Sequence, residues 1–162
     1  WSDEKIYETG EKIAVAALRY ALVKQDVDKM IVIDTDDIMK LEGDTGPYLQ
    51  YTYARALRIL EKADSEISTR PPTEPGEPEK TLLRRMAYFP ILLDEFHSNM
   101  LIKPIADYAY NLASEFNVFY EKAPVLRAEG GEKAFRLGVV KAFTIVFSIT
   151  MNLLGIPKLE VM

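Results

Sequence analysis

Two tyrosines and three basic residues fall on one side of a predicted helix in the first half of the chain. A helix turns by about 100° per residue. Spacings of 3, 4, 3 and 4 therefore place five residues in one narrow stripe, and these are Tyr48, Tyr51, Arg55, Arg58 and Lys62. The apolar residues of the same segment lie nearly opposite: Leu49, Tyr53, Ala56, Leu57, Leu60 and Ala63. If the apolar side meets the core, the stripe faces outward. Aromatic rings beside cations suit single-stranded nucleic acid, because unstacked bases lie on the rings while the cations meet phosphates.

The same pattern has a second explanation. Tyr48 and Tyr51 could pack against another helix, with the cations merely solvated, and the protein would then be a helical interaction or scaffold bundle. Accessible rings favour the first explanation, and rings sealed between helices favour the second. Stacking contributes roughly 1–3 kcal/mol per base, so two accessible rings could outweigh a modestly unfavourable net charge.

Residue counts and spacing exclude most other chemistry. The chain has no cysteine and one histidine, His97, so thiol catalysis, disulfides and sites with two imidazoles are excluded. Asp34, Asp36 and Asp37 have the wrong spacing for a calcium loop, since the later glycine and glutamate are missing. The sequence contains no phosphate-binding loop and no Gly-x-Ser-x-Gly elbow. We therefore expect neither a metal site nor a self-contained catalyst.

The charge is unevenly distributed along the 162 residues. The net charge is −5, and residues 1–47 carry all of it, with 11 acidic and 6 basic side chains. That total argues against a binder driven by charge alone, yet it leaves room for a local anion-binding surface beyond residue 47. The longest apolar stretch covers residues 142–156, 15 residues in all. A membrane span needs roughly 20, so we expect a buried helix and no membrane partner.

The elements that must position the stripe are all predicted to be helices. Apolar spacing and cap residues predict helices at 2–22 with a possible division at Gly10, at 35–41, 45–66 and 79–88, and, after a break at Pro90, at 90–98, 103–122 and 132–154. Residues 30–33 are expected to be extended. Four prolines make residues 70–80 a stiff connector inside one domain, 1–162. These elements predict an all-α bundle.

Three segments resemble a known family. Residues 42–55 read Glu-Gly-Asp-Thr-Gly-Pro-Tyr-Leu-Gln-Tyr-Thr-Tyr-Ala-Arg, and residues 112–120 read Leu-Ala-Ser-Glu-Phe-Asn-Val-Phe-Tyr. Together with Leu-Leu-Gly-Ile at 153–156 near the terminal Met162, they resemble the C-terminal anticodon-binding (DALR-type) domain of arginyl-tRNA synthetases. The resemblance implies an all-α bundle of the class Ia aminoacyl-tRNA synthetase anticodon-binding type. The corresponding domain of another class I synthetase, such as the cysteinyl enzyme, shares the bundle but lacks the long signature.

The resemblance also implies a site and its partners. The family binds the anticodon loop through a loop that corresponds to residues 41–45 here, including Asp44, and through Tyr48, Tyr51, Arg55, Tyr120 and Met162. The stripe adds Arg58 to these residues. The tyrosines and the methionine would stack on or enclose bases, and Arg55 would contact phosphate or a base. The implied partners are an arginine-accepting tRNA and the catalytic domain of the same chain.

The implied parent enzyme is a cytoplasmic ligase that joins arginine to its tRNA with ATP and Mg²⁺. Its adenylate-forming signatures, of the His-Ile-Gly-His and Lys-Met-Ser-Lys types, are absent from these residues. Because the chain also begins at Trp1, we expect a piece of a longer protein that has no cofactor of its own and does not activate arginine. Two positions depart from the family pattern: Tyr53 stands where histidine is common, and Val161 stands where arginine is common. The second departure weakens the expectation of a phosphate contact from the tail.

Overall fold

Helices and their connections make up the whole of the described chain in the computed structural model, which describes residues 2–64, 66–71 and 73–162. In these residues there is no strand, and the helices are, in order, α1 (Asp3–Val23), α2 (Thr35–Ile38), α3 (Gly46–Glu61), α4 (Glu77–Asn99), α5 (Lys103–Lys122) and α6 (Gly130–Leu153). The prediction of an all-α bundle is confirmed. The segment 30–33, expected to be extended, is an exposed connection without strand pairing.

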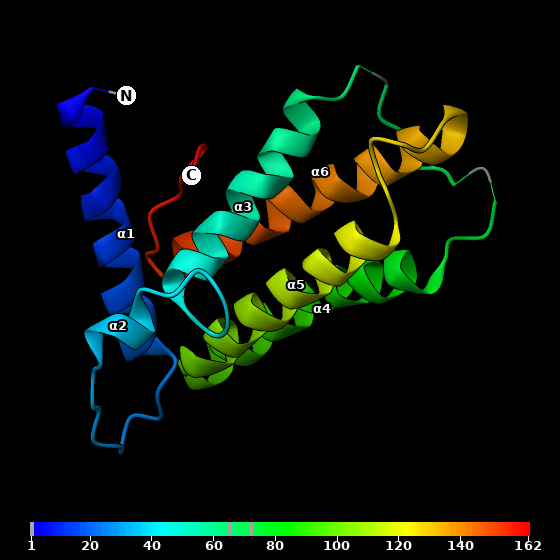
Figure 1. Ribbon diagram of the computed structural model, residues 1–162. Coiled ribbons are helices and arrows are strands. Elements are labelled where there is room, and N and C mark those ends of the chain that lie inside the picture. The colour runs from blue at the N-terminus through cyan, green and yellow to red at the C-terminus, as the bar shows by residue number, and fades with distance from the viewer. Residues whose placement is uncertain (1, 65, 72) are drawn as a thin grey trace.

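The helices form two pairs with α1 across one end. In Figure 1, α4 and α5 run side by side, α3 lies along α6, and α1 packs against the start of α3. The aromatic centre of the bundle joins α5 to α6, where the ring centroids of Phe116 and Phe143 are 4.0 Å apart and those of Phe143 and Phe147 are 4.8 Å apart. All three rings are fully buried. This packing fixes the relative positions of α5 and α6, and α3, which lies against both of them, carries most of the predicted site together with α5.

The sixth helix is long and apolar enough to cross a membrane, but half of its most apolar window is buried inside the protein. Phe143, Phe147 and Met151 are fully buried, whereas Ile145 and Ile149 are exposed. One side of α6 therefore forms the core of the bundle, as predicted for residues 142–156, and the opposite side faces outward.

Two predicted helix breaks are wrong. Helix α1 runs through Gly10, and α4 runs through Pro90 without interruption. A glycine inside a helix costs only about 0.5–1 kcal/mol relative to alanine, which the rest of α1 tolerates. At Pro90 one backbone hydrogen bond is lost, but Phe89 and Leu92 on either side of it are buried in the core. Core packing on both sides of the proline thus holds one continuous helix.

Cap residues fix where α3 begins. The hydroxyl of Thr45 accepts a hydrogen bond from the Tyr48 backbone N–H at 3.2 Å and donates one to the Lys40 carbonyl at 2.6 Å. Pro47 occupies the first turn, where no backbone N–H is needed. The helix ends at Glu61, earlier than the predicted end at 66, and α4 begins at Glu77 inside the predicted 70–80 connector. Ser65 and Pro72, which belong to these two predictions, lie outside the described residues.

Candidate nucleic-acid interface

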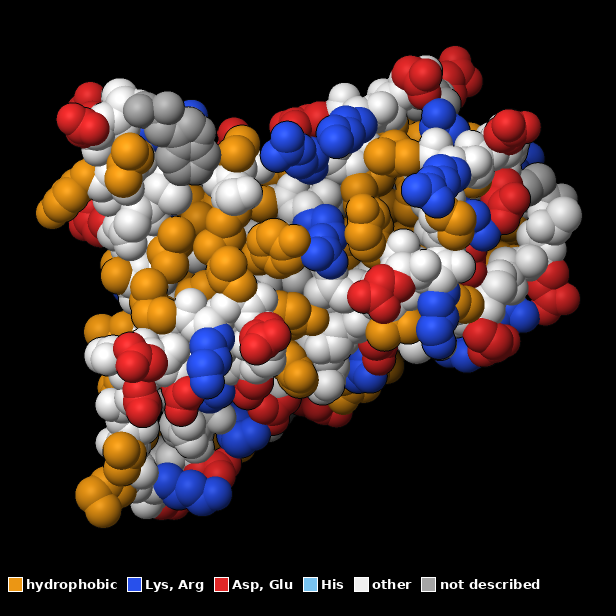
Figure 2. Space-filling model, viewed as in Figure 1, with side chains coloured by type: hydrophobic (Ala, Val, Ile, Leu, Met, Phe, Trp, Pro, Cys, Tyr) orange, Lys and Arg blue, Asp and Glu red, His pale blue; other side chains and the backbone are white. Residues whose placement is uncertain are grey.

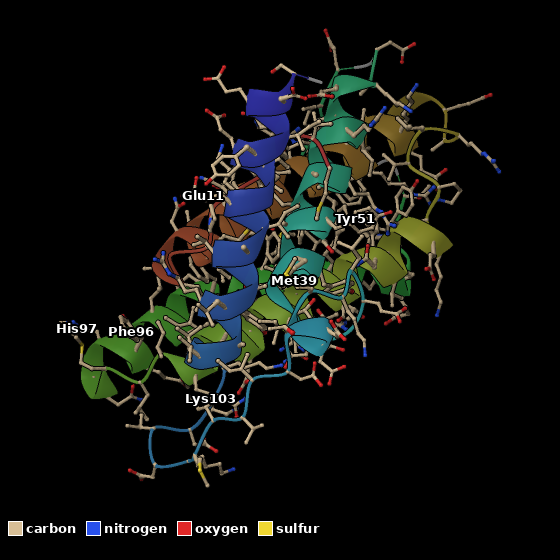
Figure 3. The ribbon with its side chains drawn as sticks, turned by 60° about the vertical axis from the view of Figure 1, so that its left-hand side comes forward. Glu11, Met39, Tyr51, Phe96, His97 and Lys103 are labelled. Carbon is tan, nitrogen blue, oxygen red and sulfur yellow. The ribbon has the colours of Figure 1, made fainter. Side chains whose placement is uncertain are left out.

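A hollow of about 520 Å³ opens beside the C-terminal half of α3. Its walls come from α3, from the end of α5 and from the C-terminal tail. The predicted residues among its lining are Tyr51, Arg55, Arg58, Lys62, Tyr120 and Met162. Figure 3 labels Tyr51 on the side of α3 turned toward α5. Residues from three distant parts of the sequence therefore meet at one place on the surface.

Arg55 lies between two aromatic rings in this hollow. Its guanidinium carbon is 4.6 Å from the ring centroid of Tyr51 and 5.1 Å from that of Tyr120. Its Nη2 also donates a hydrogen bond to the Tyr51 hydroxyl at 2.8 Å. A cation stacked on aromatic faces is stabilised by the ring quadrupoles. The result is a preformed group of two rings and one positive charge, in which the ring of Tyr120 is exposed.

Asn117 completes this group, although its sequence position alone predicted no role for it. Its side-chain oxygen accepts a hydrogen bond from Arg55 Nη1 at 2.6 Å. Its Nδ2 donates to the Tyr48 hydroxyl at 2.8 Å and to Thr52 Oγ1 at 3.1 Å. The sequence does contain an indication of this role, because a polar amide side chain stands between the core residues Phe116 and Phe119, within the segment that resembles the family. A polar side chain at such a position needs a partner.

Tyr48 has a different environment from Tyr51. It is half-buried and packs against the core, and its ring centroid is 6.0 Å from that of Tyr110. Helix α3 contacts α1, α5 and α6, so its outward side is too narrow for the whole predicted stripe. Among the described residues, neither Tyr48 nor the 41–45 loop lines the hollow. Each of the two explanations of the stripe therefore fits one tyrosine: Tyr48 lies between helices, and Tyr51 lines an open hollow.

Asp44 is engaged in holding its loop against α1. Its carboxylate accepts a hydrogen bond from the Tyr20 hydroxyl at 2.5 Å and lies 3.2 Å from Lys24 Nζ. Lys24 Nζ also donates to the Asp44 carbonyl at 2.6 Å. Burial, and next the hydrogen bond to Asp44, raise the pKa of Tyr20 far above its ordinary value, so that this phenol stays protonated and keeps donating. These contacts give Asp44 a structural role at the start of α3.

The C-terminal tail returns from α6 to the hollow. Gly155 takes a φ of 64°, a left-handed conformation that ends α6 and turns the chain back. Ile156 and Leu159 are buried, and Glu160, Val161 and Met162 then line the hollow. In Figure 1 the tail lies between α1 and α3. The terminal methionine is thus brought to Tyr51 and Tyr120, although more than 40 positions separate it from either tyrosine.

The charges around the hollow are mixed. Arg55, Arg58 and Lys62 face two carboxylates, Glu61 and Glu160. Figure 2 shows cationic side chains over α3 and a separate group of acidic side chains over α2. The acidic first third of the chain therefore contributes no carboxylate to the lining of the hollow within the described residues.

No group of three His, Cys, Asp or Glu residues that could hold a metal occurs in the part of the chain that the structure describes. His97 is exposed in the last turn of α4, well away from Tyr51 (Figure 3). The rings, amides and cations that line or adjoin the hollow suit it to binding through stacking, hydrogen bonds and charge.

The family model described as "DALR anticodon binding domain" matches residues 49–162, which include every residue that lines the hollow. The chain belongs to this family. This chain is 39% identical to the arginine–tRNA ligase of Methanopyrus kandleri over 161 residues, covering 98% of this chain and 27% of that protein. It is 38% identical to the arginine–tRNA ligase of Korarchaeum cryptofilum over 155 residues, covering 94% of this chain and 24% of that protein.

A solved structure gives the same result for the fold. The arginyl-tRNA synthetase of Thermus thermophilus matches this chain with a TM-score of 0.89 and 31% identity, covering 96% of this chain and 27% of that one. The family resemblance stated from the sequence is confirmed, and the scaffold alternative is not favoured. The chain spans about a quarter of the length of the relatives it matches.

Proposed function

We propose that this DALR domain binds the anticodon loop of an arginine-accepting tRNA in the hollow between α3, α5 and the C-terminal tail. The observation that carries the proposal is the position of Arg55 between the rings of Tyr51 and Tyr120, beside Met162. Bases splayed out of a loop would stack on the two rings and be enclosed by the methionine. Arg55 and the exposed Arg58 would contact phosphates or base edges.

The proposal extends to the longer protein. The relatives are named arginine–tRNA ligases, so we infer that this domain serves a cytoplasmic ligase of that kind and acts with the catalytic domain of the same chain. Arginine activation, with ATP and Mg²⁺, would take place outside these residues. We also treat residues 1–162 as one binding unit, because α1 is tied to the start of α3 through Tyr20 and Asp44.

Binding of an RNA hairpin tests the proposal. Fluorescence anisotropy at low salt would compare a hairpin carrying the anticodon stem and loop of arginine tRNA with the same hairpin carrying substituted anticodon bases. We expect tighter binding of the first hairpin, and Tyr51→Ala should weaken it by roughly 1–3 kcal/mol of lost stacking. The matched control is Tyr7→Ala, which removes an exposed tyrosine from α1 outside the hollow and should leave binding unchanged. Equal binding of both hairpins, insensitive to Tyr51→Ala, would contradict the proposal.

A further inference from the structure

The tail that carries Met162 to the hollow is held at several points before it arrives there. Arg19 of α1 donates a hydrogen bond from Nη1 to the Gly155 carbonyl. Lys158 Nζ donates to Ser148 Oγ at 2.8 Å, which ties the tail to α6. Leu159 is buried. Beyond Leu159 the last three residues line the hollow, so their position depends on the contacts that precede them.

Gln50 makes the central contact of this series. Its side chain is fully buried in α3, one residue before Tyr51. Its Nε2 donates to the Pro157 carbonyl of the tail at 2.7 Å and to the Lys12 carbonyl of α1 at 3.1 Å. One amide group therefore connects three segments: the helix that carries the tyrosine, the first helix and the tail.

Stability alone does not account for an amide at this position. The other polar atom of the side chain, Gln50 Oε1, is buried without a hydrogen-bond partner among the described residues. A buried acceptor left unpaired is unfavourable, and an apolar side chain of the same shape would avoid that cost. The amide is explained instead by its two donated bonds, both of which go to backbone carbonyls. Such bonds fix where the tail passes, because a carbonyl of the tail must lie within reach of a rigid, buried donor.

We propose that Gln50 is a positioning residue that holds residues 157–162 against α3 and thereby sets Met162 in the hollow. The inference rests on the proposed function for its effect on RNA, but its effect on the tail is independent of RNA. Gln50 itself is buried and is not part of the lining of the hollow. It would therefore act on a bound loop only through the tail.

The first test measures the tail without RNA. Methyl NMR of methionine-labelled protein, with the Met162 signal assigned by Met162→Leu, would compare the wild type with Gln50→Met. We expect the Met162 methyl signal to sharpen and to move toward its unfolded position in the variant. The matched control is Thr144→Val, which removes a buried hydroxyl that donates a hydrogen bond to the Lys141 carbonyl within α6. A Met162 signal unchanged by Gln50→Met would overturn the inference.

The second test separates positioning from a general loss of structure. Gln50→Met should weaken binding of the arginine anticodon hairpin roughly threefold to tenfold. In a chain that ends at Leu159, the same substitution should cause no further loss, because the tail tip through which Gln50 acts is gone. A similar loss in both backgrounds would show that Gln50 acts by another route and would overturn the inference. If the wild type does not bind the hairpin at all, the proposed function fails, while the NMR result still decides the role of Gln50.

A third variant covers the case in which Gln50→Met does not fold. Arg19 is exposed, and Arg19→Met removes its hydrogen bond from α1 to the Gly155 carbonyl. We expect a partial form of the same change, with a sharper Met162 signal and a smaller loss of hairpin binding that disappears in the chain ending at Leu159. An unchanged Met162 signal in this variant would contradict control of the tail by its contact with α1.

Discussion

The side-chain oxygen of Asn117 accepts a hydrogen bond from Arg55 Nη1 across 2.6 Å and joins α5 to α3 beside the hollow. The same amide donates through Nδ2 to Tyr48 and Thr52. One short polar side chain thus fixes the guanidinium and the tyrosine at the start of α3. Because Arg55 is already oriented between two rings, a bound loop would not have to order it, and that saves conformational entropy on binding.

Asn117→Ala should therefore lower both stability and RNA affinity. The substitution leaves Arg55, Tyr48 and the buried Thr52 hydroxyl without this partner, and we expect a loss of about 1–3 kcal/mol in the free energy of unfolding. Urea denaturation measures the first effect and hairpin binding the second. Asn111→Ala, an exposed asparagine on the same helix, is the control and should change neither. Wild-type values for Asn117→Ala in both measurements would rule out the orienting role.

Tyr120→Ala should weaken hairpin binding, while Tyr120→Phe should retain most of it. The ring of Tyr120 is the exposed part of the group that Arg55 forms with the two tyrosine rings. Stacking of a base on this ring is worth roughly 1–3 kcal/mol. The hydroxyl has no part in that stacking. Tyr88 on α4 has nearly the same exposure, 37% against 40%, so Tyr88→Ala is a matched control. If phenylalanine and alanine at position 120 weaken binding equally, stacking is not the role of this ring.

Arg58→Gln should change the salt dependence of binding. Arg58 is exposed and lines the hollow, where it would neutralise one phosphate. Removing it should reduce the slope of log K against log salt concentration by about 0.7–1, with similar losses for hairpins of different loop sequence. Arg84, exposed on α4 outside the hollow, provides the control Arg84→Gln. An unchanged slope for Arg58→Gln would mean that this side chain meets no phosphate.

Gly46→Ala should destabilise the fold, unlike Gly10→Ala. A Cβ at position 46 would lie 2.1 Å from the Ala16 carbonyl oxygen, so α1 would have to move away from α3. Overpacking of this kind costs about 1–3 kcal/mol. A Cβ at position 10 meets nothing within 4 Å, and alanine there should stabilise α1 by about 0.5–1 kcal/mol. Thermal unfolding of the two variants should shift in opposite directions, and a shared direction would contradict the close approach of the two helices.

Stability should fall at alkaline pH because of two buried tyrosines. Burial raises the pKa of Tyr20 and that of Tyr108 above the ordinary value of 10.0. Below pH 10 each tyrosine keeps its proton in both the folded and the unfolded chain, so its contribution to the free energy of unfolding is fully present there. Above pH 10 the unfolded chain loses a proton that the folded chain retains, and stability declines by up to about 1.4 kcal/mol per pH unit for each tyrosine.

Urea denaturation at pH 8 and at pH 11 measures this decline. Tyr108→Phe should remove about half of it, because phenylalanine has no proton to lose. The hydroxyl of Tyr108 donates to the Arg85 carbonyl at 3.0 Å, so this variant should also be less stable than the wild type at pH 8. Tyr7→Phe, which changes an exposed tyrosine, should follow the wild-type decline. A decline as steep in Tyr108→Phe as in the wild type would exclude this buried phenol as a cause.

Local patterns were sufficient to predict most of the helices. The apolar spacing of residues 103–122, for example, corresponds to the observed helix α5. Local patterns wrongly predicted helix breaks at Gly10 and Pro90. The low helix propensity of a single glycine or proline was considered there, whereas packing along the whole length of the helix stabilises it. Tyr48 shows the corresponding limit for the site: a helical wheel gives its direction, but the presence of Tyr110 and Asn117 in that direction depends on α5.

The sequence by itself determined the helical class and the residue types available for holding a nucleic acid, because these depend on composition and on spacings within one helix. It also indicated the family, because three of its segments resemble that family residue by residue. The tertiary structure decided which of those residues meet. Tyr51, Arg55 and Tyr120 come together because aromatic packing between α5 and α6 sets α5 beside α3, and Met162 joins them because Gly155 turns the tail back. Asn117 and Gln50 act between elements, and bonds between elements exist only once the helices have packed.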